Sequence, residues 1–274
     1  MSDRAGNRAA EFHRLHQQPR PLLLANAWDA GSARMIEACG AAAIATTSAG
    51  LAWSRGYPDG NVLPPRVLTA AVEEIARVLS VPLTVDSEGG YSTDPRAVGE
   101  TVAALVGAGA VGINLEDGGA SPELLSAKIT AAKTAALHAG VDLFVNARTD
   151  VYLRGLVPRE QAVEETIERA RRYRAAGCDG IFVPALSDPA AIRSIVAAIA
   201  LPLNVMVVPR LPPVAELATL GVRRVSAGAA IAQAAYAIAR RAATRFLTDG
   251  VYDAMFEATA DYTELNALFP SARG

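Results

Sequence analysis

The stretch LTVDSEGGY, at residues 83–91, joins an apolar, β-branched run to two acids and a pair of glycines. Such a run is typical of a buried strand that carries its polar residues at the carboxyl end. Side chains alternate along a strand, so Asp86 and Glu88 point to one side and Ser87 to the other. Like charges held about 7 Å apart in a partly desolvated pocket repel each other, which predicts that one acid is protonated or that a cation lies between them.

Short apolar segments of this kind recur along the chain, and each precedes a helix-like stretch rich in Ala, Leu, Glu and Arg. They span residues 22–26, 42–47, 83–88, 112–116, 143–148, 180–184, 203–207 and 224–227. About eight such units without a composition break predict one α/β domain over residues 1–274, a closed parallel (β/α)8 barrel of the TIM type with additional C-terminal helices. A doubly wound open sheet is the alternative, but the first turn, NAWDAG at 26–31, lacks the GxGxxG pattern.

The connections that leave these segments are polar, whereas those that enter them are short and marked by Gly or Pro. The polar connections are TTSAG at 46–50, DSE at 86–88, NLED at 114–117, NARTD at 146–150 and Asn204. In a barrel all carboxyl ends meet at one face, where barrel enzymes keep their active sites. This asymmetry predicts catalysis at that face.

Three acids are predicted to converge there, because Glu116 ends the strand after that of Asp86 and Glu88, and parallel neighbours lie about 4.8 Å apart. Asp59, in the loop GYPDG at 56–60, is placed over the same mouth. Carboxylates without His or Cys favour a hard ion, Mg²⁺ with retained waters, and Mn²⁺ is the substitute. Helix capping or arginine pairing could also explain Glu88 and Glu116, and an ordinary turn could explain Asp59.

Arg148 closes the segment 143–148 and faces the acids. We expect it to anchor a metal ligand or to bind a substrate oxyanion bidentately, and a salt bridge to Glu116 alone is the alternative. Ser48, Ala49 and Gly50 offer small side chains and exposed amides that suit a carboxylate or phosphate.

The net charge of −2 gives no argument for nucleic acid or an anionic membrane as a partner. No apolar run reaches the ~20 residues of a membrane span, and the polar N-terminus lacks the apolar core of a signal peptide, so a soluble, cytoplasmic protein is expected. Cys39 and Cys178 lie far apart and are interpreted as small buried hydrophobes. His13 and His16, on a polar helix expected over 9–18, are interpreted as surface residues rather than metal ligands.

The segment 247–274 is predicted to add more helix than the barrel needs. Its apolar stripe consists of Tyr252, Met255, Phe256, Tyr262, Leu265 and Phe269. A neighbouring subunit is one candidate to cover this stripe, and packing within the same chain is the other.

Six short motifs, in this order, resemble the isocitrate lyase/phosphoenolpyruvate mutase superfamily. They are NAWD at 26–29, SAG at 48–50, YPD at 57–59, VDSEGGY at 85–91, LED at 115–117 and ARTD at 147–150, and the likeness continues to PLN at 202–204 and ELN at 264–266. The resemblance implies an α/β barrel enzyme that binds Mg²⁺ and makes or breaks C–C or P–C bonds in small 2-oxo or 2-hydroxy acids. It also implies homotetramers built from dimers that exchange a C-terminal helix.

The resemblance also implies roles for single residues. Asp86 would be the direct metal ligand, with Asp59, Glu88 and Glu116 acting largely through water.

The same comparison implies a substrate site beside the metal. The amides of Ser48, Ala49 and Gly50 would hold the substrate carboxylate, and Arg148 its 2-oxygen. Asn204 is a further candidate for substrate binding.

Cleavage next to a 2-oxo group leaves an enolate, which Mg²⁺ and Arg148 would stabilise more than the starting carbonyl. Tyr91, Asp59 or a metal-bound water is the candidate proton carrier.

The chain departs from the family pattern at two places. Glu88 stands where the family usually has Asp, and after Glu116 the chain reads DGGASPE instead of a mobile loop with Lys, Cys and His. Ser121 and Pro122 in this segment predict the start of a helix. Isocitrate or methylisocitrate lyase activity is therefore not expected, and the Lys-Asn loop of the mutase is missing too.

Two other functions fit the same residues. The first is a degenerate member that binds Mg²⁺ and a 2-oxo acid, such as 2-oxoglutarate or oxaloacetate, with little turnover. The second is a phosphate-binding barrel isomerase or aldolase that uses AGAA at 227–230 at the start of a helix.

Overall fold

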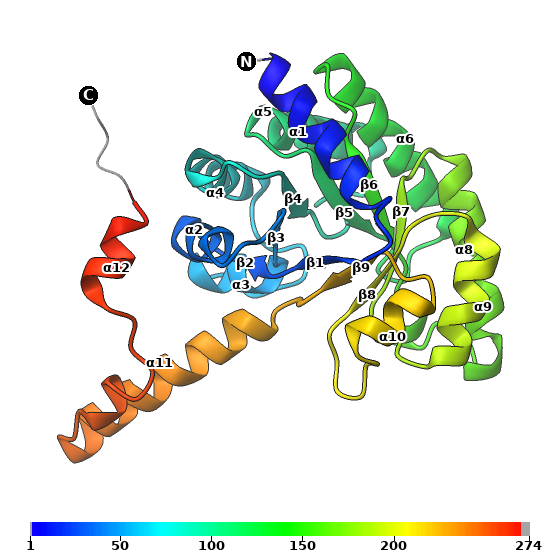
Figure 1. The fold of residues 1–274 in the computed structure, drawn as a ribbon. Helices are drawn as coiled ribbons and strands as arrows, with labels where there is room; N and C mark the ends of the chain where they lie inside the picture. The colour runs from blue at the N-terminus through cyan, green and yellow to red at the C-terminus, as the bar shows by residue number, and fades with distance from the viewer. Residues whose placement is uncertain (1, 270–274) are drawn as a thin grey trace.

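Parallel strands form one nine-stranded sheet in the computed structural model, which describes residues 2–269 and the side chains from residue 5 onward. The strands are β1 (Leu22–Leu24), β2 (Asn26–Ala27), β3 (Ile44–Thr46), β4 (Leu83–Asp86), β5 (Gly112–Glu116), β6 (Phe144–Arg148), β7 (Gly180–Val183), β8 (Leu203–Met206) and β9 (Arg224–Ser226). They follow the order β1-β9-β8-β7-β6-β5-β4-β3-β2, and the two edge strands are joined by Ala25 alone (Figure 1). The predicted (β/α)8 barrel is therefore confirmed.

The predicted first strand, residues 22–26, is divided between the two edges of the sheet. Its first part, β1, pairs with β9, and its last part, β2, pairs with β3. Asn26 fastens the junction, because its Nδ2 donates to Thr46 O at 2.7 Å and its Oδ1 accepts from Gly228 N at 3.0 Å. One extended segment thus closes the barrel.

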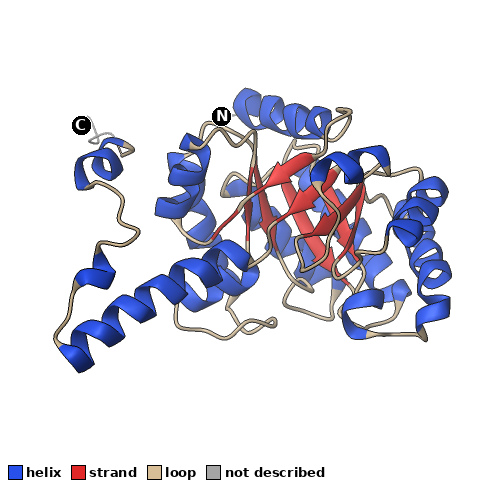
Figure 2. Cartoon of the chain, turned by 60° about the horizontal axis from the view of Figure 1, so that its bottom comes forward, coloured by secondary structure: helices blue, strands red, loops and turns tan. Residues whose placement is uncertain are grey.

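Helices surround the strands (Figure 2). They are α1 (Ser2–Leu15), α2 (Ala30–Ala38), α3 (Ser48–Ser54), α4 (Pro65–Val78), α5 (Pro95–Gly107), α6 (Pro122–His138), α7 (Val151–Arg154), α8 (Ala162–Ala175), α9 (Pro189–Ile199), α10 (Val214–Thr219), α11 (Ala230–Asp249) and α12 (Tyr262–Ala267), with 3₁₀ turns η1 (Arg159–Gln161) and η2 (Asp253–Met255). The predicted helix start at Ser121 is confirmed, since its side chain accepts from Leu124 N. None of the helices in residues 2–269 has the length and apolar character needed to cross a membrane.

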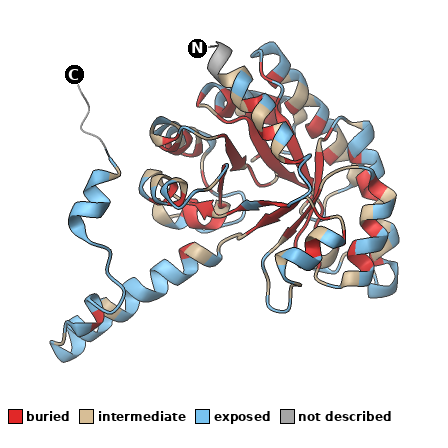
Figure 3. Cartoon of the chain, in the orientation of Figure 1, coloured by how far each residue is buried: buried red, intermediate tan, exposed pale blue. Residues whose placement is uncertain are grey.

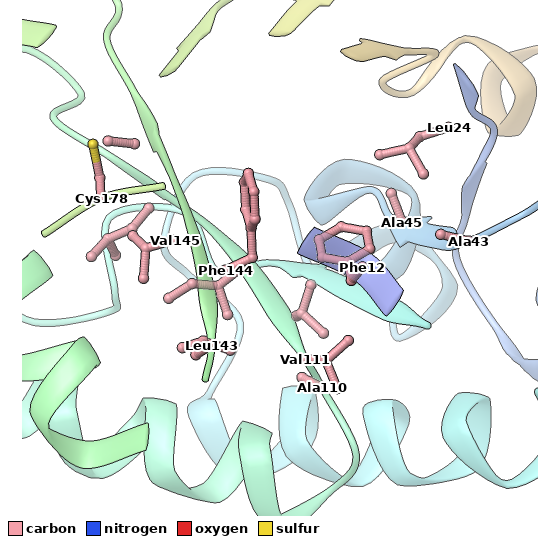
Figure 4. Close-up of a cluster of buried hydrophobic side chains, with 14 of the residues drawn as sticks. Phe12, Leu24, Ala43, Ala45, Ala110, Val111, Leu143, Phe144, Val145 and Cys178 are labelled. Atoms are coloured by element: carbon pink, nitrogen blue, oxygen red, sulfur yellow. The ribbon is translucent and has the colours of Figure 1, made fainter. Parts of the chain in front are cut away.

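Helix α1 closes the amino-terminal end of the barrel. Phe12 is fully buried among the strand side chains, near Phe144 (Figure 4). His16 stacks on Phe144 with ring centroids 4.0 Å apart. A Cβ at Gly112 would lie 2.6 Å from Phe12 Cε1, so the glycine makes room for this ring. The surface interpretation is therefore wrong for His16, because Phe12 and His16 are four residues apart and share the helix face that meets the core. His13 stays partly exposed.

A polar layer lies inside the barrel. Asn114 Oδ1 accepts from Arg224 Nη2 at 3.1 Å and from Asn146 Nδ2 at 2.9 Å. Asn146 Nδ2 also lies 3.0 Å from Asn204 Oδ1, and Asn204 donates to Ser226 Oγ at 3.2 Å. These bonds join β5, β6, β8 and β9 across the interior, while Nε and Nη1 of the buried Arg224 have no hydrogen-bond partner among the described residues.

The C-terminal arm, residues 230–269, begins with α11, which leads away from the barrel (Figures 1 and 2). Its end returns to α2, where Arg34 Nε donates to Leu268 O at 3.0 Å. Along α11, Ala232 is the one residue that is buried (Figure 3). In the predicted apolar stripe, Tyr252, Phe256 and Tyr262 are 59%, 70% and 81% exposed. Packing within the chain therefore does not cover this stripe.

The two cysteines differ in environment. Cys178 is buried, as expected, whereas Cys39 is exposed. Cys39 directly follows the last turn of α2 as its C-cap, so the apolar context that suggested burial belongs to the helix before it.

The burial of His16 predicts a pH-dependent loss of stability. Its Nδ1 donates to Phe12 O at 2.8 Å, so a second proton would occupy Nε2. Burial, and then the nearby Arg224 cation, lower the pKa of His16 from 6.5 to about 3. Because the folded-state pKa lies below the unfolded-state value, the contribution to stability is complete above pH 6.5 and is lost as the pH falls toward 3. Between pH 7 and pH 5 the loss is about 2 kcal/mol.

Urea unfolding of wild type and His16→Phe at pH 7 and pH 5 measures this term. We expect the variant to lose about 2 kcal/mol less than wild type over this interval. His138→Gln, which removes an exposed histidine, is the control and keeps the wild-type dependence. Equal losses in wild type and His16→Phe would contradict the assignment.

Candidate active site

The carboxyl ends of β4, β5 and β6 bring Asp86, Glu116 and Arg148 to one mouth of the barrel. Glu116 and Arg148 are register partners, and Arg148 Nη1 lies 2.6 Å from Glu116 Oε2. Asp150 holds the same guanidinium. Its Oδ1 accepts a hydrogen bond from Arg148 Nε at 2.7 Å, and its Oδ2 accepts one from Arg148 Nη2 at 3.2 Å. The salt bridge to Glu116 is therefore present, but it is not the only one that Arg148 makes. Two carboxylates fix the plane of the arginine.

This mouth holds more negative charge than its arginine neutralises. Burial raises the pKa of Glu116 to about 8, even though Arg148 acts in the opposite direction. Burial also raises the pKa of Asp86 and of Glu88, and the charge of Asp86 adds to the rise for Glu88. Carboxylates in such a pocket favour a bound proton or a nearby cation.

Glu88 is held by the loop that carries Asp59. Its Oε1 accepts from the Tyr91 hydroxyl at 3.0 Å, and its Oε2 accepts from the backbone N–H of Asn61. Asn61, Glu88 and Tyr91 have φ values of 61°, 49° and 59°. A left-handed backbone costs about 1–3 kcal/mol at residues other than glycine and gathers at functional sites. Asp59 is close enough for its charge to raise the pKa of Glu88.

The side chains at the mouth fit a hard divalent cation, because Asp86, Glu88, Glu116 and Asp59 offer oxygen atoms alone. In the part of the chain that the structure describes, no group of three or more His, Cys, Asp or Glu side chains is placed to hold one ion jointly. Protein groups already engage both oxygens of Glu88 and Oε2 of Glu116. The oxygens of Asp86 accept only at 3.4 Å, from the N–H groups of Ser48 and Glu88, so they are less engaged than those of Glu88.

Ser48, Ala49 and Gly50 form the first turn of α3, directly after β3. The Ser48 N–H points to Asp86 Oδ2 at 3.4 Å, so this turn borders the acids. Close packing requires Gly50, because a Cβ there would lie 2.8 Å from Thr47 Cγ2.

Asn204 lies apart from this turn. It is 1% exposed in the polar layer, where its side chain bonds to Asn146 and Ser226.

A second group of charges, which the motifs did not single out, supports Arg148. The side chain of Asp150 is fully buried, and its N–H donates to Asp117 Oδ1 at 3.0 Å. Asp117 Oδ2 accepts from Arg169 Nη1 at 2.9 Å and from the Tyr173 hydroxyl at 2.8 Å. Asp117 is the last residue of the motif LED and Asp150 of the motif ARTD, so the sequence did offer a signal for both acids. Their partners on α8 lie 52 and 56 positions from Asp117, and spacing alone does not reveal them.

Comparisons with known protein sequences agree with this geometry. The family model for phosphoenolpyruvate phosphomutase matches residues 12–247. An uncharacterised protein of Mycobacterium tuberculosis (strain ATCC 25618 / H37Rv) is 39% identical over 260 residues, which are 93% of this chain and 95% of that protein. An oxaloacetate decarboxylase of Rhodopseudomonas palustris (strain BisB18) is 34% identical over 158 residues, which are 54% of this chain and 52% of that protein.

Solved structures share the fold. A Burkholderia cenocepacia J2315 protein, provisionally assigned as a phosphonomutase, matches with a TM-score of 0.81 and 44% identity, over 85% of this chain and 98% of that one. Phosphonopyruvate hydrolase in complex with oxalate and Mg²⁺ matches with a TM-score of 0.81 and 25% identity, over 95% of this chain and 94% of that one. The resemblance predicted from the motifs is confirmed.

Because Asp117 supports Arg148 through Asp150, even a small change of the Asp117 side chain should lower the free energy of unfolding considerably. Asp117→Asn keeps the size of the side chain and removes the charge that faces the buried Arg169. We expect a loss of about 1–2 kcal/mol in the free energy of unfolding, because Arg169 keeps only Glu165 as an acidic partner among the described residues and the buried Tyr173 hydroxyl loses its charged acceptor. Urea unfolding at pH 7 measures it.

Glu123→Gln is the matched control, since it also removes an acid paired with an arginine of α8, but both of its partners are solvent-exposed. Its unfolding midpoint should equal that of wild type. Equal effects of the two substitutions would show that the buried network does not stabilise the fold.

Proposed function

Because the chain belongs to the phosphoenolpyruvate phosphomutase family, we propose that it is a Mg²⁺-dependent enzyme that makes or breaks a C–C or P–C bond in a small 2-oxo or 2-hydroxy carboxylic acid. The observation that carries this proposal is the mouth itself. Buried carboxylates surround an arginine whose orientation is fixed by Glu116 and Asp150. Oxygen ligands beside a fixed cation suit substrates that carry a carboxylate and an adjacent oxygen.

Asp86 would hold Mg²⁺ directly, and Asp59, Glu88 and Glu116 would hold it through water. A bound Mg²⁺ supplies Lewis-acid stabilisation of negative charge at the substrate oxygens. Mn²⁺ fits the same oxygen ligands.

Arg148 stabilises the negative 2-oxygen as it develops. Its guanidinium is held on two sides before substrate arrives, so little reorganisation is needed when charge moves onto that oxygen. Burial weakens screening by water and strengthens the interaction. Charge on the 2-oxygen grows on the way to an enolate, and the arginine therefore favours the transition state over the starting carbonyl.

The turn of Ser48, Ala49 and Gly50 binds the substrate carboxylate through backbone N–H groups. Tyr91 carries the transferred proton in this proposal. Burial, and then the charge of Glu88, raise the pKa of the Tyr91 hydroxyl, which keeps its proton at neutral pH and donates to Glu88. The raised pKa makes this hydroxyl a weak acid, so it would protonate only a strongly basic carbanion of the kind that bond cleavage leaves behind.

A second candidate function is binding with little turnover. The loop after β5 runs through Asp117, Gly118, Gly119 and Ala120 to Ser121, and it carries no Lys, Cys or His. A chain that keeps the metal and oxyanion sites but lacks loop acids would bind a 2-oxo acid such as 2-oxoglutarate without converting it.

We also propose that two copies exchange the helix α11. Leu23 of β1 and Met35 of α2 line an apolar groove on the outer side of the sheet, and they are 40% and 37% exposed. Barrels normally cover this side of a strand with a helix. The arm leads away from this groove and exposes Phe246 and Leu247 by 51% and 79%. A second copy of the arm supplies an apolar helix of the kind that this groove lacks, and the assembly is a dimer or a tetramer of such dimers.

Calorimetry and turnover assays test the proposed chemistry. We expect the protein to bind Mg²⁺ and, when loaded, oxalate, and to convert oxaloacetate or phosphonopyruvate in a Mg²⁺-dependent way, with methylisocitrate assayed beside them. Asp86→Asn should weaken Mg²⁺ binding at least about a hundredfold, the upper end of the effect of outer-shell partners. Binding of Mg²⁺ and 2-oxoglutarate without turnover of any of these acids would favour the second candidate. Failure of the protein to bind Mg²⁺ would refute both candidate functions.

Leu247→Glu tests the exchange of α11. Burying a charge in the interface costs several kcal/mol, so the variant should elute as a smaller species on size exclusion with light scattering. Leu137→Glu is the matched control, because Leu137 is a similarly exposed leucine (74%) on α6, away from the arm, and its elution should match wild type. Deletion after Ala229, which removes α11, should also reduce the mass of the assembly by more than the deleted residues. An unchanged oligomer in both arm variants would overturn the proposal.

A further inference from the structure

A polar pocket opens beside the mouth, and Glu116 forms part of its lining. Its cavity volume is about 360 Å³, and it is bordered by the loops that follow β4 and β5. Asn61, Tyr91 and Glu116 belong both to this pocket and to the site described above. The pocket is therefore continuous with the place where substrate would bind.

Lys128 enters the pocket from helix α6. The residue is 7% exposed, and its Nζ donates to Gly89 O at 2.7 Å. An ammonium group has three protons, so this bond fixes Nζ at the pocket wall and leaves further donors. Glu116 favours the charged form of Lys128, against the effect of its burial.

Arg154 enters the same pocket from α7. Its Nε donates to Asp150 Oδ2 at 2.9 Å, which is the carboxylate that also orients Arg148. Within residues 2–269, Nη1 and Nη2 of Arg154 make no hydrogen bond, and its side chain is 54% exposed. A Cβ on Gly119 would lie 3.9 Å from Arg154 Cδ, so the short loop runs along the arginine stem without covering its end.

The acids around the pocket are already paired elsewhere. Glu116 contacts Arg148 at 2.6 Å, and Asp117 contacts Arg169 at 2.9 Å. Lys128 and Arg154 thus bring two positive charges to a pocket whose two acids already face other arginines. A desolvated lysine with an arginine fork is a common arrangement for binding an anionic oxygen group.

We propose that Lys128 and Arg154 form a subsite for a second carboxylate of the substrate, so that this enzyme selects 2-oxo or 2-hydroxy dicarboxylates over the corresponding monocarboxylates. The inference rests on the proposed function, because the first carboxylate and the 2-oxygen must occupy the site of Ser48 and Arg148. The inference adds the residues that bind the end of the substrate opposite the first carboxylate. Both lie on helices, in contrast to the loop residues of the lyases that this chain resembles.

Calorimetry on the Mg²⁺-loaded full chain tests the subsite with matched ligands. The pairs are malate with 2-hydroxybutyrate and 2-oxoglutarate with 2-oxovalerate, which differ in the distal carboxylate, and oxalate probes the inner site alone. Wild type should bind at least one dicarboxylate about tenfold or more tightly than its partner. Arg154→Gln and Lys128→Met should each reduce that ratio by about tenfold, while oxalate affinity stays within about twofold.

Arg96→Gln is the control, since Arg96 pairs with Glu100 on the exposed face of α5 and should keep the wild-type ratio. Two variants on separate helices guard against a local folding defect in one of them. An unchanged ratio in both, or equal loss of oxalate and dicarboxylate binding in both, would overturn the subsite and leave the proposed function standing. Failure of the wild-type protein to bind oxalate would overturn the proposed function and the subsite with it.

Discussion

Buried negative charge is the constraint around which the mouth of this barrel is built. Asp86, Glu88 and Glu116 stand where water cannot solvate them fully, and burial raises the pKa of each. Arg148 offsets part of that charge, and Asp150 holds the arginine from behind. A site of this kind is stable when a cation completes it, which links the cost of burying the acids to the ability to bind a metal.

The scaffold keeps these charges in place by closing the barrel from two directions. One extended segment supplies both β1 and β2 and joins the edges of the sheet. Helix α1 then fills the amino-terminal end with Phe12, while the asparagine layer spans the middle. The mouth therefore rests on a core that resists deformation. The left-handed backbone of Asn61, on one loop, and of Glu88 and Tyr91, on another, can persist because their surroundings determine it.

The sequence predicted the barrel and the convergence of the acids, because short runs apolar on both faces and polar strand ends are local signals. It did not predict that His16 is buried, since the partner that buries it, Phe144, lies far along the chain. The chain from Asp150 through Asp117 to Arg169 was missed for the same reason. Local patterns specify elements and their polar ends, whereas charge networks depend on which elements come into contact.

Lys128 and Arg154, the proposed partners of the second carboxylate, lie on helices, and this placement affects how the substrate is recognised. A mobile loop must be ordered when substrate binds, at a cost of about 1–2 kcal/mol for each residue fixed. Lys128 on α6 and Arg154 on α7 are positioned beforehand, one by Gly89 O and the other by Asp150. Asp150 also orients Arg148, so a substrate held at both ends meets two arginines whose separation is set by one carboxylate. Discrimination then depends on the length between the two anionic ends of the substrate, because neither arginine can move without breaking its bond to that carboxylate.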